Sequence, residues 1–245
     1  MSLEINLDKK VVIVTGAASG IGAGIAAMMA RAGATVEGCD INGSAGITAV
    51  DVTDKSSVTG FVNAVAQRQG RIDIVISCAG GNVFTGAANC SEDDWNRNIQ
   101  LNLASHWELA RACKTHLEKT GNGVIIIITS NHAFSTIPGC FPYNVAKTAL
   151  TGLVRSLAIE WGPLIRTVGV APGFIDTPGN QTWFNSFPSP EEERKRTENL
   201  HPVKKLGTPE EIGGWCVFLA SSYAAFSSGT TYLVDGGRSA LMQDV

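Results

Sequence analysis

The sequence has no long apolar run, no block of basic residues and no closely paired cysteines, and each absence excludes a class of protein. No apolar stretch is long enough for a membrane-spanning helix, so we expect no membrane segment. The first ten residues, MSLEINLDKK, lack the apolar core of a secretion signal. The formal net charge is only −3 and the lysines and arginines are scattered, which argues against nucleic acid or an anionic membrane as a partner.

The six cysteines form no Cys-x-x-Cys pair, and most of them lie inside apolar segments. Buried free thiols are typical of a reducing compartment, so we expect a cytoplasmic protein. A zinc site needs clustered ligands, and the sequence contains no such cluster, so we predict no metal.

What the sequence does contain is an ample supply of core residues and glycines. The chain has 245 residues, of which 44% are hydrophobic and 27 are glycine, which suits one α/β domain or two small ones. No internal repeat, linker or low-complexity segment divides it. We therefore expect a single domain over residues 1–245.

Apolar runs rich in β-branched residues alternate with segments of helical period. The expected strands cover residues 11–14, 35–39, 47–50, 72–77, 124–129, 167–171 and 232–234. The expected helices cover residues 20–32, 55–69, 91 to about 117, 141–161 and 209–220, and Ser91 with Asp94 resembles an N-terminal capping box. Runs such as VVIV and VIIIIT are typical of strands buried on both faces, so the alternation predicts a parallel sheet covered by helices on both sides. Between Asp40 and Ile47 only a turn fits, in place of a helix.

The segment TGAASGIG, residues 15 to 22, follows the first expected strand and opens the first expected helix. Unpaired N–H groups and the helix dipole at such a position favour a phosphate. We expect Gly16 to allow the turn, and Gly20 and Gly22 to allow close approach of the cofactor and the strand. The alternative is a tight turn that has no ligand.

Asp40 lies at the end of the second expected strand, about 20 residues after the glycines, where a dinucleotide site places an acidic residue. Its carboxylate can accept hydrogen bonds from the adenosine ribose and would repel a 2′-phosphate. Ser19 supplies no positive charge for such a phosphate. The sequence therefore predicts NAD(H) rather than NADP(H) as the cofactor.

The spacing Gly-x-x-x-Gly-x-Gly resembles the cofactor motif of the short-chain dehydrogenase/reductase family. The other landmarks of that family follow in order, as DV at residues 51–52, CAG at 78–80, LN at 101–102, TS at 129–130, YNVAK at 143–147, APG at 171–173 and VDGG at 234–237. The resemblance covers nearly the whole chain. It implies a three-layer, doubly wound Rossmann fold with a parallel seven-stranded sheet in the order 3-2-1-4-5-6-7. It also implies a homotetramer or homodimer, in which the helices over residues 91–117 and 141–161 pack pairwise. Trp107 and Trp161 would suit such a contact if they are exposed, but they could equally belong to the core.

Tyr143 and Lys147 are four residues apart on an expected helix and therefore share a face. A free tyrosine has a pKa of about 10, and we expect the neighbouring ammonium and an oxidised nicotinamide to lower it. Such a tyrosine can take a proton from an alcohol or return it to a ketone oxygen. Ser130 ends the fifth expected strand, where ligands bind in such sheets. The alternative is an ordinary tyrosine and lysine on a helix face.

The resemblance assigns further roles. Ser130 would hold the substrate oxygen, Lys147 would also bind the nicotinamide ribose, and Asn102 matches the asparagine of a proton relay, although it could merely cap a local distortion. The expected catalytic residues are Asn102, Ser130, Tyr143 and Lys147. The expected cofactor-binding residues are Gly16, Ser19, Gly20, Ile21, Gly22, Asp40, Asp51, Val52, Ala79, Gly80, Tyr143, Lys147, Pro172, Gly173, Ile175 and Thr177.

The chain departs from the family pattern at Cys78, where the family has an asparagine that ties neighbouring strands together. We interpret Cys78 as a structural substitution, because nothing near it in the sequence would activate a thiolate. Val168 also replaces a customary asparagine. His132 could contact the substrate or could be a solvated loop residue.

The longest segment outside the sheet covers residues 179–207, and its aromatic residues Trp183, Phe184 and Phe187 suit either a lid over the substrate or a helix packed on the core.

We predict an NAD-dependent dehydrogenase that acts on a small secondary alcohol such as a polyol, sugar acid, hydroxy acid or cyclic diol. The alternatives are a reductase of oxoacyl thioesters and a dinucleotide-binding protein without activity.

Overall fold

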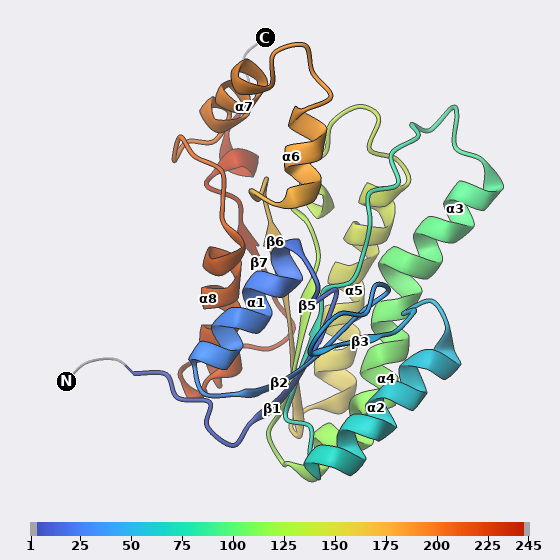
Figure 1. Cartoon of the computed structure of the whole chain (residues 1–245), viewed down its shortest axis with the longest axis vertical. Helices are drawn as coiled ribbons and strands as arrows, with labels where there is room; N and C mark the ends of the chain where they lie inside the picture. Colours follow the sequence, from blue (N-terminus) through green and yellow to red (C-terminus); the bar gives the residue numbers. More distant parts are fainter. Residues whose placement is uncertain (1–3, 243–245) are drawn as a thin grey trace.

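The computed structural model describes residues 4–242. Its core is a sheet of seven parallel strands in the order β3-β2-β1-β4-β5-β6-β7, with helices on both faces (Figure 1). This confirms the predicted strand order and the doubly wound α/β fold.

The strands coincide with the apolar runs of the sequence, and the central ones are buried completely. They are β1 (Val11–Thr15), β2 (Thr35–Asp40), β3 (Ile47–Ala49), β4 (Ile74–Ser77), β5 (Gly123–Ile128), β6 (Ile165–Pro172) and β7 (Thr231–Val234). The strand β4 begins two residues later than predicted, whereas β6 is longer at both ends. Between β2 and β3 the chain makes only a short turn with an isolated bridge from Ser44 to Ile47, as predicted.

Two helical layers cover the sheet and produce two apolar clusters. The helices α1 (Gly20–Arg31) and α8 (Pro209–Ala220) pack together on one face. The helices α2 (Lys55–Gln69), α4 (Ser105–Lys119) and α5 (Tyr143–Trp161) cover the other face (Figure 1). The branched aliphatic side chains of β1, β4 and β5 alternate between the two clusters, which explains why these runs of the sequence are apolar throughout.

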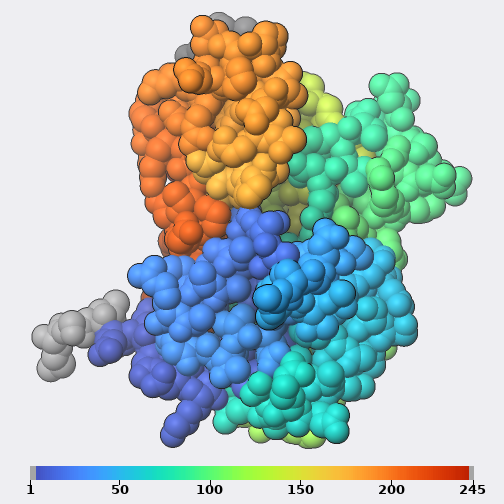
Figure 2. All heavy atoms as spheres, viewed as in Figure 1, coloured from blue at the N-terminus to red at the C-terminus, as the bar shows by residue number. Residues whose placement is uncertain are grey.

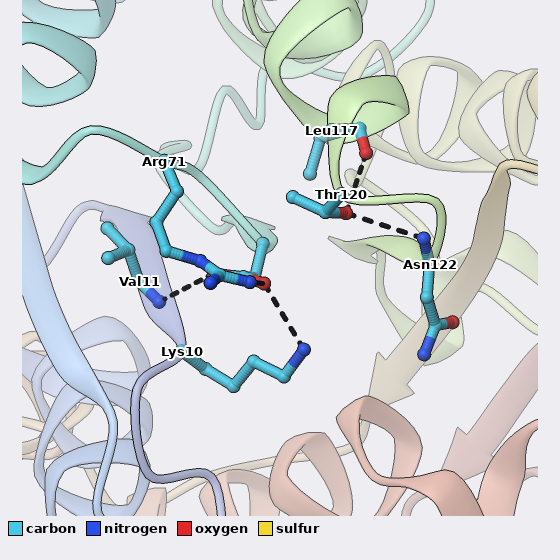
Figure 3. Close-up of polar contacts among 7 residues, drawn as sticks. Lys10, Val11, Arg71, Leu117, Thr120 and Asn122 are labelled. Carbon is cyan, nitrogen blue, oxygen red and sulfur yellow. Dashed lines mark hydrogen bonds and ion pairs between the residues drawn. The ribbon is translucent and has the colours of Figure 1, made fainter.

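An ion cluster holds together the amino-terminal ends of β1 and β4. The Asp73 carboxylate, which is buried, accepts hydrogen bonds from the Val11 N–H at 3.0 Å, from Arg71 at 2.6 and 2.8 Å and from the Lys10 ammonium at 3.2 Å. Figure 3 shows Lys10 and Arg71 approaching this point from the segments that precede β1 and β4. Burial raises the pKa of Asp73, but the three donors outweigh burial and lower the pKa overall.

Two parts of the helical layer differ from the prediction. The long helix expected over residues 91–117 is three pieces, namely α3 (Glu92–Ile99), a π-helical segment (Gln100–Ala104) and α4. The predicted cap is present, because Ser91 Oγ accepts the Asp94 N–H at 3.0 Å. The segment after β6 contains two helices that were not predicted, α6 (Pro178–Phe184) and α7 (Pro190–Asn199), and both lie at the top of Figure 1.

The contact between α1 and α8 depends on the absence of a side chain at Gly24. A Cβ atom there would lie 2.3 Å from Pro209 Cβ and 2.6 Å from the Pro209 carbonyl carbon. We predict that Gly24→Ala lowers the free energy of unfolding by about 1–3 kcal/mol, because the two backbones must move apart. Urea denaturation followed by circular dichroism measures this change.

The matched control is Gly60→Ala in α2, where a Cβ atom would meet nothing within 4 Å. Alanine favours a helix over glycine by about 1 kcal/mol, so this variant should be as stable as the original chain or more stable. Equal effects of the two substitutions would contradict the packing argument.

Candidate active site

The glycine loop between β1 and α1 brings the helix start close to the strand. Gly16 has a φ of +69°, which favours glycine, and a Cβ atom on Gly22 would lie 2.0 Å from the Gly16 carbonyl oxygen. Ser19 is the N-cap residue of α1, yet within residues 4–242 its side chain makes no capping hydrogen bond, and the first turn of α1 has no acidic residue. The helix α8, in contrast, carries a complete capping box from Thr208 and Glu211. The first N–H groups of α1, at Gly20 to Gly22, are therefore available to an anion.

Asp40 lies beside this loop at the carboxyl end of β2. One carboxylate oxygen accepts the Ala18 N–H at 3.2 Å and the other accepts the Asn42 N–H at 3.1 Å. Asp40 is thus fixed against the glycine loop while its side chain remains partly exposed. This is the position that the sequence predicts for it.

Four further candidate cofactor residues follow the strands β3 and β4. Asp51 and Val52 lie just after β3, where the Asp51 carboxylate accepts the Thr53 N–H at 2.8 Å. Ala79 and Gly80 follow β4, and a Cβ atom on Gly80 would lie 2.9 Å from Asn102 Oδ1 and 3.5 Å from Lys147 Nζ. The Gly80 backbone therefore runs close to both of these side chains.

The candidates after β6 are held mainly by backbone contacts. Pro172 ends the strand, and the Gly173 N–H donates to the Val234 carbonyl at 3.0 Å. Ile175 is buried, and the Thr177 hydroxyl caps α6 by accepting the Asn180 N–H at 3.3 Å. A Cβ atom on Gly20 would lie 3.4 Å from the Thr177 methyl group, so this segment and the glycine loop face one another.

Tyr143 and Lys147 lie on one face of α5, as the spacing predicts. Tyr143 is the first residue of the helix, and the Lys147 ammonium lies 5.6 Å from the centroid of its ring. The Lys147 side chain is buried, and Nζ donates to the Ile128 carbonyl at the end of β5 at 3.1 Å. The pair is therefore fixed at the carboxyl edge of the sheet.

The pKa values of these two groups correct one expectation. Burial raises the pKa of Tyr143 to about 12, although the nearby Ser130 hydroxyl acts in the opposite direction. Burial also lowers the pKa of Lys147 to about 8. We expected the ammonium to lower the tyrosine pKa, and this is wrong for the protein groups alone, because loss of hydration outweighs the Ser130 hydrogen bond that acts in the lowering direction.

Ser130 lies two residues after the end of β5 and comes close to Tyr143. Its Oγ accepts the His132 N–H at 3.1 Å, so the hydroxyl proton of Ser130 remains free to be donated elsewhere. The His132 ring lies 6.0 Å from the Tyr143 ring, edge to face. His132 is therefore a neighbour of the candidate catalytic residues.

Asn102 and a residue that the sequence analysis missed, Asn98, connect these elements. Asn102 accepts the Gly81 N–H at 3.1 Å and donates to the Gly81 carbonyl at 2.8 Å and to Asn98 Oδ1 at 2.9 Å. Asn98 in turn donates to the Pro142 carbonyl at 2.9 Å, just before Tyr143. Both asparagines are fully buried, and the i, i+4 spacing of two asparagines on a mostly apolar face was the available signal.

Cys78 is compensated by another residue that the sequence analysis missed. Thr15 Oγ1, at the end of β1, accepts the N–H groups of Cys78 and Ala79, both at 3.0 Å. The tie between neighbouring strands is therefore present without an asparagine at position 78. Burial raises the pKa of the Cys78 thiol to about 12, in agreement with a structural role.

The other predictions about ligands and thiols can be checked over residues 4–242. All six cysteines are free, and four of them are buried. Across this range no group of three or more His, Cys, Asp or Glu side chains could hold a metal ion. In the same range no helix is both long and apolar enough to cross a membrane.

The aromatic residues of α6 form a cluster next to the Gly173–Thr177 segment. Trp183 and Phe184 lie 5.5 and 5.4 Å from the Phe174 ring, and Phe187 lies 4.7 Å from Trp183. Phe184 is buried, whereas Trp183 keeps 39% of its surface exposed. Phe184 therefore packs on the core, which was one alternative of the sequence analysis, while the lid alternative stays a prediction for the exposed Trp183.

The surface is hollowed beside the candidate site. Figure 2 shows this hollow between the orange segment of α6 and α7 and the green segment that follows β4. A cavity of about 520 Å³ lies between α8, β7 and the residues around His201, and it borders the candidate cofactor residues Gly173 and Ile175. Its lining includes neither Tyr143 nor Lys147.

Comparison with known proteins relates most of the chain to oxidoreductases. Residues 16–239 match the sequence family described as enoyl-(acyl carrier protein) reductase. Human dehydrogenase/reductase SDR family member 4 is 34% identical, covering 94% of this chain and 88% of its own. The ligand-free aldohexose dehydrogenase of Thermoplasma acidophilum superposes with a TM-score of 0.92 at 30% identity, covering 98% of this chain and 97% of its own. A 7α-hydroxysteroid dehydrogenase complexed with NADH and 7-oxoglycochenodeoxycholic acid superposes with a TM-score of 0.88 at 30% identity, covering 97% and 98%.

The buried position of Asn98 yields a testable prediction. Asn98→Ala leaves the Pro142 carbonyl and the Asn102 amide without their partner, so the start of α5 should lose its fixed position. We expect the free energy of unfolding to fall by about 1–3 kcal/mol. The thermal midpoint measures this loss.

The control is Asn96→Ala, which changes an exposed asparagine of the same helix. It should leave the thermal midpoint within the error of the measurement. A similar midpoint for both variants would mean that the buried amide bonds do not hold α5 in place.

Proposed function

The chain belongs to the short-chain dehydrogenase/reductase family, and from this we propose that it is an NAD(H)-dependent oxidoreductase that interconverts a secondary alcohol and a ketone. The observation that carries the proposal is the meeting of Tyr143, Lys147 and Ser130 at the carboxyl edge of the sheet, next to the uncapped start of α1. Ligands bind at this edge in open α/β sheets.

In the proposed mechanism Tyr143 exchanges the proton and Ser130 orients the reacting oxygen. The Tyr143 phenolate takes the proton of the alcohol, and in the reverse direction the phenol gives that proton to the ketone oxygen. The Ser130 hydroxyl can donate its proton to the same oxygen, because Oγ serves the His132 N–H only as an acceptor. NAD bound at this site would supply the hydride acceptor and, in its oxidised form, a positive charge near the phenol.

Lys147 supports this step through its position. Its ammonium is held between the Ile128 carbonyl and the Tyr143 ring, so the positive charge faces the phenol and also lies 3.5 Å from a Cβ position on Gly80. Asn102 fixes the backbone of Gly81 next to it. We propose that Lys147 also binds the nicotinamide ribose and that Asn102 connects the site to a proton relay.

The residues of the glycine loop suit the phosphates and the adenosine of NAD. The start of α1 offers backbone N–H groups, and the Gly22 backbone lies too close to Gly16 for any side chain. The Asp40 carboxylate, fixed beside the loop, would accept the ribose hydroxyls and repel a 2′-phosphate. A related hydroxysteroid dehydrogenase whose structure was determined with NADH supports this choice.

We also propose that residues 1–245 form one domain and that the protein is cytoplasmic. Two further proposals concern a lid over the substrate and an assembly of several subunits. Trp183 and the helices α6 and α7 would cover the substrate, since the Arg194 guanidinium of α7 pairs with Asp176 beside the expected nicotinamide segment. For the assembly, Trp107 on α4 keeps 44% of its surface exposed, whereas Trp161 is partly buried and packs against the core, as the other alternative had it. Ile159 on α5 also faces solvent. These two helices therefore offer apolar surface for a homodimer or homotetramer.

Replacing the phenol tests the mechanism. Tyr143→Phe keeps the ring and removes the group that exchanges the proton, so we expect kcat to fall by about 100- to 10,000-fold. The affinity for NADH, measured by fluorescence titration, should change by less than about threefold, because binding is dominated by the loop and Asp40. The substrate is the best secondary alcohol from a panel assayed with NAD at 340 nm.

The control for this test is Tyr223→Phe, which removes the hydroxyl of an exposed tyrosine far from the site in sequence. It should retain full turnover. Undiminished turnover in Tyr143→Phe would show that another group exchanges the proton.

Replacing the carboxylate of Asp40 tests the cofactor. Asp40→Asn keeps the shape but removes the negative charge, so NADH binding should weaken about tenfold and NADPH binding should improve. The ratio of the two dissociation constants, measured by fluorescence titration, is the readout. Asp54→Asn, which changes an exposed helix-capping carboxylate, should leave the ratio unchanged. Tighter binding of NADPH than of NADH by the unchanged chain would refute the cofactor assignment.

A further inference from the structure

The aromatic rings of Phe84, His132 and Tyr143 meet at the candidate active site. The Phe84 and His132 rings each meet the Tyr143 ring edge to face, at 5.2 and 6.0 Å between centroids, and they lie 6.1 Å from each other. Phe84 belongs to the segment after β4, whereas His132 follows β5. Two separate parts of the chain thus each bring a ring to the tyrosine, and the three rings form a triangle.

The imidazole of His132 is held in a fixed orientation. Its backbone N–H is bonded to Ser130 Oγ at 3.1 Å, and its ring Nδ1 is bonded to Thr136 Oγ1 at 3.0 Å. Among residues 4–242 no group bonds to the other ring nitrogen, Nε2, and the side chain is half-buried. One polar atom next to Ser130 and Tyr143 is therefore available to a ligand.

The surroundings of this atom are uncharged. Burial lowers the pKa of His132, so the imidazole is neutral at neutral pH and can exchange one hydrogen bond but cannot attract a carboxylate as a cation. Phe84, with 46% of its surface exposed, adds an apolar wall. The Lys147 ammonium of the same site is buried and donates to the Ile128 carbonyl.

We infer that His132 is a specificity-determining residue whose Nε2 binds a second, uncharged oxygen on the carbon next to the reacting carbon of the substrate. The inference rests on the proposed function and narrows its substrate class to vicinal diols and hydroxyketones, of which cyclic polyols are the fullest example. Phe84 would contact the C–H face of such a ring, as aromatic walls do in sites with few polar groups. Hydroxy acids and sugar acids, which the sequence left open, carry a carboxylate, and neither Phe84 nor the neutral His132 offers a positive charge to bind it.

The proposed reaction is the two-electron oxidation of a diol to a hydroxyketone. One C–H bond and one O–H bond of the diol break, the hydride goes to NAD and the proton goes to the Tyr143 phenolate. The product is a hydroxyketone, whose second hydroxyl remains on His132 throughout.

Two probes that differ by one hydroxyl test the inference, namely cis-1,2-cyclohexanediol and cyclohexanol, each assayed with NAD at 340 nm. We expect kcat/KM to be at least about tenfold higher for the diol, which is the worth of one hydrogen bond. His132→Phe keeps an aromatic ring against Tyr143 and Phe84 but removes Nε2, so it should lower this ratio by about tenfold. His132→Gln, which retains a hydrogen-bonding group, should restore part of the ratio.

The control is His116→Phe, the same chemical change in the last turn of α4, which should leave the ratio unchanged. A ratio near one in the unchanged chain, or an unchanged ratio in His132→Phe, would overturn the inference. Turnover of other alcohols but of neither probe would overturn it as well, with the proposed function intact. Absence of turnover with every alcohol and ketone tested would instead refute the proposed function, and this inference with it.

Discussion

The arrangement of the site depends on the burial of one ammonium group. Lys147 is only 4% exposed, and the acceptor that it reaches is the Ile128 carbonyl at the end of β5. A buried charge without a hydrogen-bond acceptor is costly, so the first turns of α5 must stay above the end of this strand. Ser130 lies two residues beyond Ile128, and therefore the same constraint brings Ser130 to Tyr143. The candidate catalytic residues thus come together because a single cation has to be satisfied.

The start of α5 is held from the other side by neutral hydrogen bonds. Asn98 binds the Pro142 carbonyl and Asn102 binds the backbone of Gly81, so α3, the π-helical segment, α5 and the segment after β4 move as one unit. A π-helical turn accommodates one additional residue, which allows a side chain to be redirected from the regular helix face. Here it coincides with Asn102, the residue that carries the bonds to Gly81.

The sequence was sufficient for features that depend on local composition. The strands, their order and the faces of the main helices follow from apolar runs and from the family landmarks, and the Tyr143–Lys147 spacing follows from the period of a helix. The π-helical segment could not be predicted in the same way, because it depends on a contact between Asn102 and Gly81, which are 21 residues apart. The helix α7 was missed because its sequence, PEEERKRTEN, has no apolar stripe, and it is ordered by ion pairs such as that between Arg194 and Asp176. Its proline at the first helical position, after Ser189, was the signal that remained.

The pKa values explain why the site needs a charge beyond those of its own residues. Burial alone keeps the Tyr143 phenol protonated, with a pKa of about 12, and it brings the pKa of Lys147 to about 8. The same lack of water strengthens any charge that enters, because electrostatic attraction increases as the local dielectric constant falls. A positive charge next to the phenol would therefore stabilise the phenolate far more in this site than at the surface. It follows that the tyrosine becomes a useful base only when the site is filled, and this coupling suits an enzyme in which proton and hydride leave the same alcohol.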